Sequence, residues 1–180
     1  MVKKKVKKSS NLLSLILPLV AVVLGVAAFC MMFLPCVEVV SKNGDLIKAF
    51  SGSNIAFGLS ETETLIVSVT SKTLGFGFLA LLGFVFPLLG GASLFFAKKN
   101  KIFTFVSMAL FAVGALLIFL MTTWFASGLI TENGEGFIAV GGIYKANELV
   151  LHRLGVGAII GGILSILGAC VGAAKLVLKK

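Results

Sequence analysis

The chain has 180 residues, of which 58% are hydrophobic and only 13% are charged, whereas soluble domains have about 45–50% apolar and about 25% charged residues. An ordinary water-soluble core is therefore excluded, and we expect one membrane domain covering residues 1–180. The net charge of +9 would favour nucleic acid on a soluble surface, but most lysines lie in three short segments without an aromatic platform, so we expect no nucleic-acid partner.

The N-terminal part combines a basic tail, residues 1–11, with a first apolar run, residues 12–34. A secretory signal has an apolar core of only about 7–15 residues, so this longer run predicts an uncleaved first membrane span. Pro35 ends the run, because proline disfavours helical geometry in the residue before it.

Residues 35–73 form the first outer loop, and their pattern changes to short β-prone segments. Residues 37–42 and 45–50 flank Asn43 and Gly44, a residue pair preferred in two-residue type I′ hairpin turns. Residues 64–70 alternate between apolar and polar side chains and predict a half-buried strand. Two strands alone are marginal in water, so we expect a third strand, joined to the helix ends, to complete an ordered cap.

Two apolar runs of 24 residues each, 74–97 and 102–125, are separated only by residues 98–101. As helices they would extend about 36 Å, enough to cross a hydrocarbon core of about 30 Å. A four-residue connection cannot cross the bilayer again, so the two runs predict an antiparallel pair of spanning helices. The connection contains three lysines and no acid, which predicts that it lies on the cytoplasmic side.

The second outer loop, residues 126–153, is rich in glycine. Residues 137–140 are a candidate strand, and residues 146–152 are a candidate helical lead-in to the last span. His152 and Arg153 lie next to each other at the outer end of that span and form a candidate polar site on the outer face.

The last apolar run, residues 154–178, carries small residues at helical spacing, which lets another helix backbone approach closely. We expect packing within the chain there and keep a dimer interface as the alternative. Lys175, in the last turn, is expected to extend towards the headgroups of the inner leaflet. The predicted helix-packing residues are Gly157, Gly161, Ser165, Gly168, Ala169, Gly172 and Ala173.

The charges are segregated along the chain. Lysines precede the first run, occupy the short connection and end the chain, whereas all seven acidic residues lie in the two other loops. This positive-inside pattern predicts a multi-pass plasma-membrane protein whose N- and C-termini are cytoplasmic and whose lysine clusters contact anionic lipids of the inner leaflet. The ratio of 15 lysines to one arginine is typical of a bacterial chain from an AT-rich genome.

Little in the sequence points to chemistry. The central parts of the spans contain no acidic or basic residue and no His, Asn or Gln, which disfavours ion-coupled transport. With one histidine and only Cys36 as a loop cysteine, a zinc site would need carboxylates to complete it. We therefore predict no catalytic residue, no cofactor and no metal site.

The layout resembles the claudin-like tetraspan membrane proteins: four spans, both ends inside, a longer first outer loop with β character and a shorter second one. The resemblance implies that strands of both outer loops pair into one small sheet on a left-handed four-helix bundle. The family's loop motif is absent, because Gly58 and Leu59 are followed by Ser60, and the loop lacks tryptophan and paired cysteines. A cell-junction function is therefore not implied.

The predicted fold is an all-α membrane protein, a four-transmembrane-helix bundle with a small extracellular β-sheet cap formed by the outer loops. The preferred function is a non-enzymatic integral membrane protein that serves assembly or binds a partner, either another membrane protein or a second copy. One alternative is a small oligomeric channel or passive transporter. Another is a membrane enzyme subunit that uses His152 and Arg153 on a lipid-linked substrate.

Overall fold

The computed structural model describes residues 2–40, 44–64, 68–74, 77–97, 101–123, 136–139, 142–145 and 151–178. The chain divides into two compact units. The helical unit comprises Met1–Cys30, Gly83–Leu116 and Ile160–Lys180, and the sheet unit comprises Met31–Leu82 and Leu117–Ile159.

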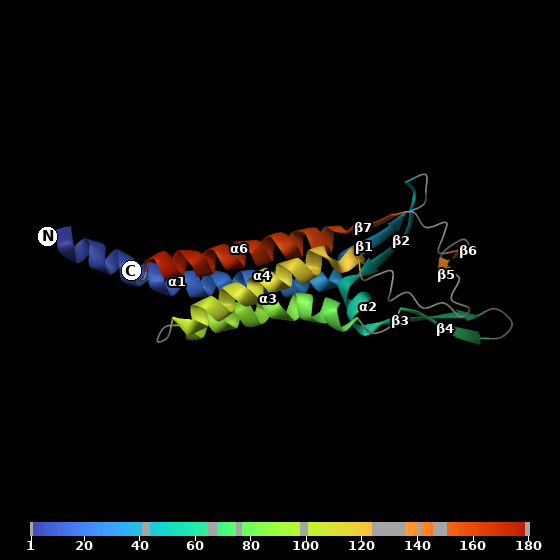
Figure 1. Ribbon diagram of the computed structural model, residues 1–180, viewed down its shortest axis with the longest axis horizontal. Coiled ribbons are helices and arrows are strands. Elements are labelled where there is room, and N and C mark those ends of the chain that lie inside the picture. Colours follow the sequence, from blue (N-terminus) through green and yellow to red (C-terminus); the bar gives the residue numbers. More distant parts are fainter. Residues whose placement is uncertain are drawn as a thin grey trace. The chain divides into compact units, whose positions relative to one another are not determined.

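Four helices are long and apolar enough to span a membrane: α1 (Val2–Cys30), α3 (Phe78–Phe96), α4 (Ile102–Phe119) and α6 (Val156–Leu178). In the first of them the apolar part is Ile16–Phe33, which includes the short 3-10 helix η1 (Met31–Phe33). Figure 1 shows the four helices running side by side. They indicate a multi-pass membrane protein and agree with the four apolar runs of the sequence.

The helix boundaries differ from those of the apolar runs. The helical conformation of α1 extends back to Val2, through the basic tail. At the other ends, α3 begins only at Phe78 and α6 only at Val156, because Leu74 and Leu154 belong to paired strands. Hydropathy predicts apolar residues correctly at these ends but does not distinguish a helix from a strand.

Within the helical unit, α1 and α3 approach each other at the level of their backbones. A Cβ atom at Gly91 would lie 2.8 Å from the carbonyl oxygen of Ala21 and 3.0 Å from the Cα atom of Val22. A Cβ atom at Gly25 would lie 2.5 Å from the carbonyl oxygen of Pro87. Only glycine permits contacts this close, as at many interfaces between membrane helices.

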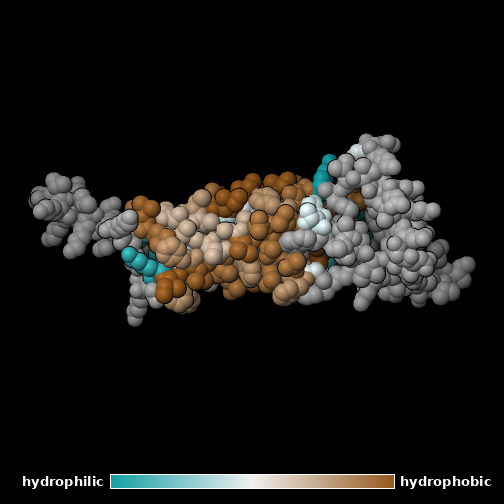
Figure 2. All heavy atoms as spheres, in the orientation of Figure 1, coloured by the Kyte–Doolittle hydropathy of each residue, from teal (hydrophilic) through white to brown (hydrophobic). Residues whose placement is uncertain are grey.

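The helical unit has an apolar cluster in its interior and apolar side chains on its outside. Phe111 is fully buried in a cluster with Ala21, Leu94 and Ala97. On the outside, large apolar side chains such as Leu116 are more than half exposed. Figure 2 shows hydrophobic residues over the visible face of the helices. Exposed apolar surface of this extent suits contact with lipid rather than water.

The sheet unit contains an antiparallel three-stranded sheet in the order β2-β1-β7, made of β1 (Pro35–Val40), β2 (Leu46–Ser51) and β7 (Leu151–Leu154). The third strand therefore comes from the second predicted outer loop. The expectation of a helical lead-in is wrong for Leu151 and His152, because these residues pair with Val40 and Val39 of β1. The sheet joins segments of the chain that are far apart in the sequence.

The pairing of β1 with β2 is consistent with the predicted hairpin. Val37 lies opposite Phe50, and Val39 lies opposite Lys48, so the two strands run antiparallel on either side of the segment that contains Asn43 and Gly44. The register then shifts by one between Val39 and Val40. Gly44 has a φ of +87°, but Asn43 lies outside the described residues, so the turn type stays a prediction.

Two further strand pairs and one short helix complete the sheet unit: β3 (Leu59–Thr64) with β4 (Ser68–Leu74), β5 (Gly136–Ala139) with β6 (Gly142–Lys145), and α2 (Gly52–Phe57). A single strand over residues 64–70 is wrong, because Thr64 of β3 pairs with Ser68 of β4 in an antiparallel arrangement, and residues 65–67 lie outside the described residues. The candidate strand at 137–140 overlaps β5.

Replacing Gly91 with valine tests the close contact between α1 and α3. We expect Gly91→Val to lower the free energy of unfolding by about 1–3 kcal/mol, because the added atoms overlap the α1 backbone. Ala92→Val is the matched control, since Ala92 is the next residue along α3 and is exposed. Thermal unfolding in detergent would measure both variants, and equal midpoints would contradict the contact.

Candidate functional site

The clearest polar interaction of the sheet joins its central strand to β7. Glu38 of β1 and Arg153 of β7 lie directly opposite each other, and Arg153 Nε donates to Glu38 Oε2 over 2.6 Å. Glu38 is the more enclosed partner, with 17% of its side chain exposed against 57% for Arg153. The ion pair therefore ties the two predicted outer loops together at one point.

The backbone reinforces this junction just beyond the sheet. Gly155 N–H donates to the carbonyl oxygen of Cys36 over 2.8 Å, and a Cβ atom at Gly155 would lie 2.5 Å from the carbonyl oxygen of Pro35. At Gly157, the first predicted helix-packing position, a Cβ atom would lie 2.8 Å from the carbonyl oxygen of Met31 and 2.9 Å from Cys36 Sγ. The beginning of α6 is thus held against the first residue of η1 and the beginning of β1.

The Cys36 thiol lies inside this junction, with no exposed surface. Its Sγ donates towards the carbonyl oxygen of Leu34 at 3.3 Å and that of Met31 at 3.6 Å. Burial raises the pKa of the thiol from 9.0 to about 11, and a backbone hydrogen bond from Gly52 opposes part of that rise. The protonated thiol is therefore a donor that keeps its proton at neutral pH.

The candidate polar site of the sequence is only partly described. Arg153 points to Glu38, as above, while His152 occupies the position in β7 opposite Val39. The side chain of His152 lies outside the described part of the chain. Among the side chains that the structure describes, no group of three or more His, Cys, Asp or Glu residues is arranged to hold a metal ion.

The small residues of α6 beyond Gly157 belong to the helical unit, and two of them contact α4. Gly168 lies against the Phe111 ring of α4, and a Cβ atom at Gly172 would lie 2.6 Å from Met108 Cγ. Ser165 is fully buried, and its Oγ donates to the carbonyl oxygen of Gly161 in the preceding turn over 2.8 Å. Gly161 is also buried, whereas Ala169 and Ala173 are half-buried.

Lys175, which the sequence predicts to extend towards the headgroups of the inner leaflet, is enclosed by other parts of the protein. Its side chain is only 7% exposed, and its Nζ donates to the carbonyl oxygen of Leu94 over 2.8 Å. Leu94 lies in the last turn of α3, where its carbonyl oxygen also accepts the backbone N–H of Ala97 over 3.3 Å and the helix dipole favours a cation. The lysine thus joins the ends of α6 and α3.

Sequence reasoning did not assign Glu38, Cys36 or Ser107 to the contacts that they make. Ser107 of α4 donates through Oγ to the carbonyl oxygen of Gly90 in α3 over 2.6 Å. The sequence signal for the ion pair was a single arginine close to loops that hold all the acidic residues. That signal does not select one acid, because the choice depends on which strands pair.

No model of a protein family matches the chain, and no curated protein matches it. The four candidate spanning helices and the small sheet nevertheless fit a tetraspan topology.

A double-mutant cycle on Glu38 and Arg153 would measure the ion pair. We expect a coupling free energy of about 0.2–1 kcal/mol, since the arginine is more than half exposed and water screens the interaction. Glu38→Gln, Arg153→Ala and the double variant would be unfolded in detergent at low and at high salt. The coupling should shrink at high salt, and strictly additive effects at low salt would contradict a stabilising pair.

The buried thiol predicts a pH dependence of stability. The unfolded chain releases the Cys36 proton near pH 9.0, whereas the folded protein keeps it up to about pH 11. The thiol's contribution to stability is therefore complete below pH 9 and is lost as the pH rises towards 11. Unfolding midpoints would be compared between wild type and Cys36→Ala, which lacks the group. Parallel pH profiles over this interval would contradict the prediction.

Proposed function

We propose that the protein is a non-enzymatic plasma-membrane protein of a bacterial cell that serves assembly or binds a partner through its outer loops. The observation that carries the proposal is the pairing of β1 with β7, fastened by Glu38 and Arg153. It gives two loops from distant parts of the chain one shared surface. A surface of that kind suits recognition of another protein better than two separate loops would.

In this proposal the four helices form a bundle in the bilayer, and the sheet forms a cap on its extracellular side. The contacts at Gly91 and Gly168 support the bundle, because Gly91 meets the backbone of α1 and Gly168 meets the Phe111 ring of α4 at distances that only glycine allows. The charge pattern supports the orientation: the lysine-rich ends and the connection around Lys101 would face the cytoplasm. These lysines would contact the anionic lipids of the inner leaflet.

The likeness to claudin-like proteins supports the same arrangement. In that layout strands of both outer loops share one sheet, and here β1 and β7 come from the two predicted outer loops. Architecture alone does not determine function, so the likeness concerns only the arrangement of the loops. The partner is proposed to be another membrane protein or a second copy of the chain, with no role for nucleic acid.

Two cysteine variants would test the orientation. The three native cysteines are first replaced by alanine. Leu46→Cys or Lys101→Cys then introduces a single thiol, and both positions are exposed in the structure. Leu46 belongs to the sheet, and Lys101 precedes α4. We expect an impermeant maleimide to label only Leu46→Cys on intact cells and to label Lys101→Cys after permeabilisation. The opposite pattern would contradict the orientation.

The same variants would test partner binding. A maleimide-linked photocrosslinker attached at Leu46→Cys should give a discrete product with another protein, absent from Lys101→Cys and weakened by Arg153→Ala. A regular ladder of products of the chain with itself would instead favour an oligomeric channel. Products that are identical for both attachment sites would contradict recognition by the sheet.

A further inference from the structure

The short helix α2 exposes a phenylalanine although most of its surface is enclosed. Gly52, Ile55 and Ala56 are buried, whereas the side chain of Phe57 is 60% exposed. A single exposed apolar residue needs no explanation by itself. The significance of Phe57 therefore depends on what lies next to it.

Helix α2 is held against the beginning of α3. Gly77, directly before α3, donates its backbone N–H to the carbonyl oxygen of Ala56 over 3.2 Å. A Cβ atom at Gly77 would collide with the carbonyl oxygen of Ile55, so glycine is required for this approach. Helix α2 also contacts η1, which ends the first candidate span. It consequently lies beside the ends of two spanning segments.

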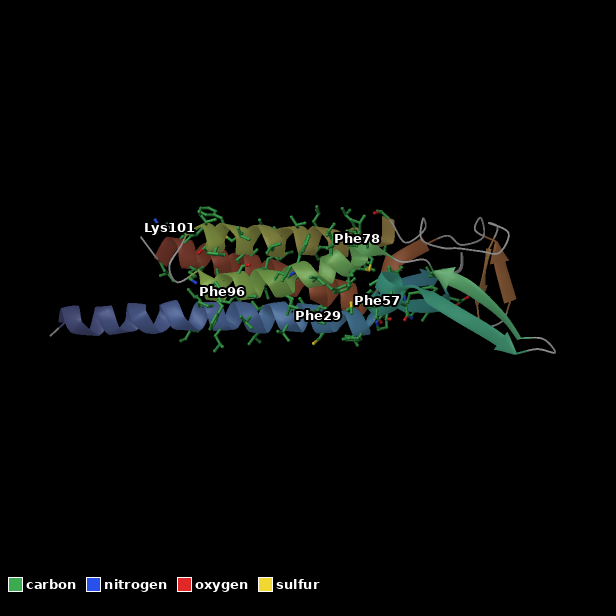
Figure 3. All side chains as sticks on the ribbon, turned by 90° about the horizontal axis from the view of Figure 1, so that it is seen from below. Phe29, Phe57, Phe78, Phe96 and Lys101 are labelled. Carbon is green, nitrogen blue, oxygen red and sulfur yellow. The ribbon has the colours of Figure 1, made fainter. Side chains whose placement is uncertain are left out.

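Each of those two ends carries an exposed phenylalanine of its own. Phe33, the last residue of the first candidate span, is 64% exposed, and Phe78, the first residue of α3, is 57% exposed. Figure 3 shows Phe57 and Phe78 on the neighbouring elements α2 and α3. Aromatic side chains at the ends of spanning helices are favoured at the boundary between lipid and water.

Both ends of α2 are fixed, which determines where Phe57 is presented. The Ser51 side chain caps the helix by accepting a hydrogen bond from Asn54 N over 3.2 Å. Gly58 ends it directly after Phe57, with φ of +86° and ψ of 163°, a backbone conformation that is essentially restricted to glycine. The aromatic ring therefore projects from the last helical position rather than from a freely moving loop.

We propose that α2 lies in the outer membrane–water interface, with the Phe57 ring among the lipids of the outer leaflet. The occupant is lipid because α2 contacts the ends of two candidate spans, and each of those ends carries an exposed aromatic residue of its own, Phe33 or Phe78. This inference rests on the proposed insertion of the four helices into a membrane. Since α2 follows β2 directly, its contact with lipid would fix the height of the sheet above the bilayer.

The test uses tryptophan fluorescence of the full chain in phosphatidylcholine vesicles. Trp124, the single native tryptophan, is replaced by phenylalanine, and one new tryptophan is introduced by Phe57→Trp, Leu46→Trp or Leu116→Trp. The three positions are similarly exposed, at 60%, 55% and 58%. Leu46 lies at the other end of β2 from α2, about 16 Å along the strand, and Leu116 lies on the spanning helix α4. Brominated lipids report contact with acyl chains, and iodide reports contact with water.

We expect brominated lipid to quench Leu116→Trp strongly, Phe57→Trp by about half as much, and Leu46→Trp hardly at all. Iodide should quench Leu46→Trp several-fold more than Phe57→Trp. If Phe57→Trp behaves like Leu46→Trp, or is protected from both quenchers by protein, the interfacial position of α2 is wrong while membrane insertion is unaffected. If Leu116→Trp also escapes brominated lipid, the proposed insertion itself fails.

Discussion

Close approach between helix backbones is the constraint on which the helical unit depends. Lipid tails are as apolar as the side chains that they would meet, so helices in a bilayer gain little from hydrophobic burial and rely on close contact and hydrogen bonds. Helix α3 meets α1 at Gly91 and α4 at Gly114, where a Cβ atom would lie 2.6 Å from Pro87 Cδ. In each contact a glycine of one helix leaves room for the backbone or for a proline ring of the neighbouring helix.

The contacts between α3 and α4 also involve backbone carbonyl groups of α3, for which lipid offers no hydrogen-bond donor. Pro87 has no N–H, so the carbonyl of Gly83 loses its usual helical donor, and the close approach of α4 at Gly114 covers that carbonyl. One turn further along α3, Ser107 donates to the carbonyl oxygen of Gly90 from α4. Both contacts bring α4 against α3 close to Pro87.

The parts of the structure that were predictable are those whose signal is local. Each spanning helix follows from one uninterrupted apolar run, and the need for a third strand follows from the instability of an isolated hairpin. The pairing of Glu38 with Arg153 joins residues 115 positions apart, so no local pattern contains it. Helix α2 is too short for a periodic signal, and its position depends on glycine at 77, which is informative only once the opposite backbone is known.

Lys175 shows how one charge can serve both orientation and packing. The cost of burying a lysine in the last turn of a spanning helix is partly offset when its ammonium meets carbonyl groups at the end of another helix, because the dipole there favours positive charge. Its bond to Leu94 joins the ends of α3 and α6, and the sequence places both ends beside lysine-rich segments. If that side is cytoplasmic, the residue that contributes to the positive-inside pattern also holds two spans together.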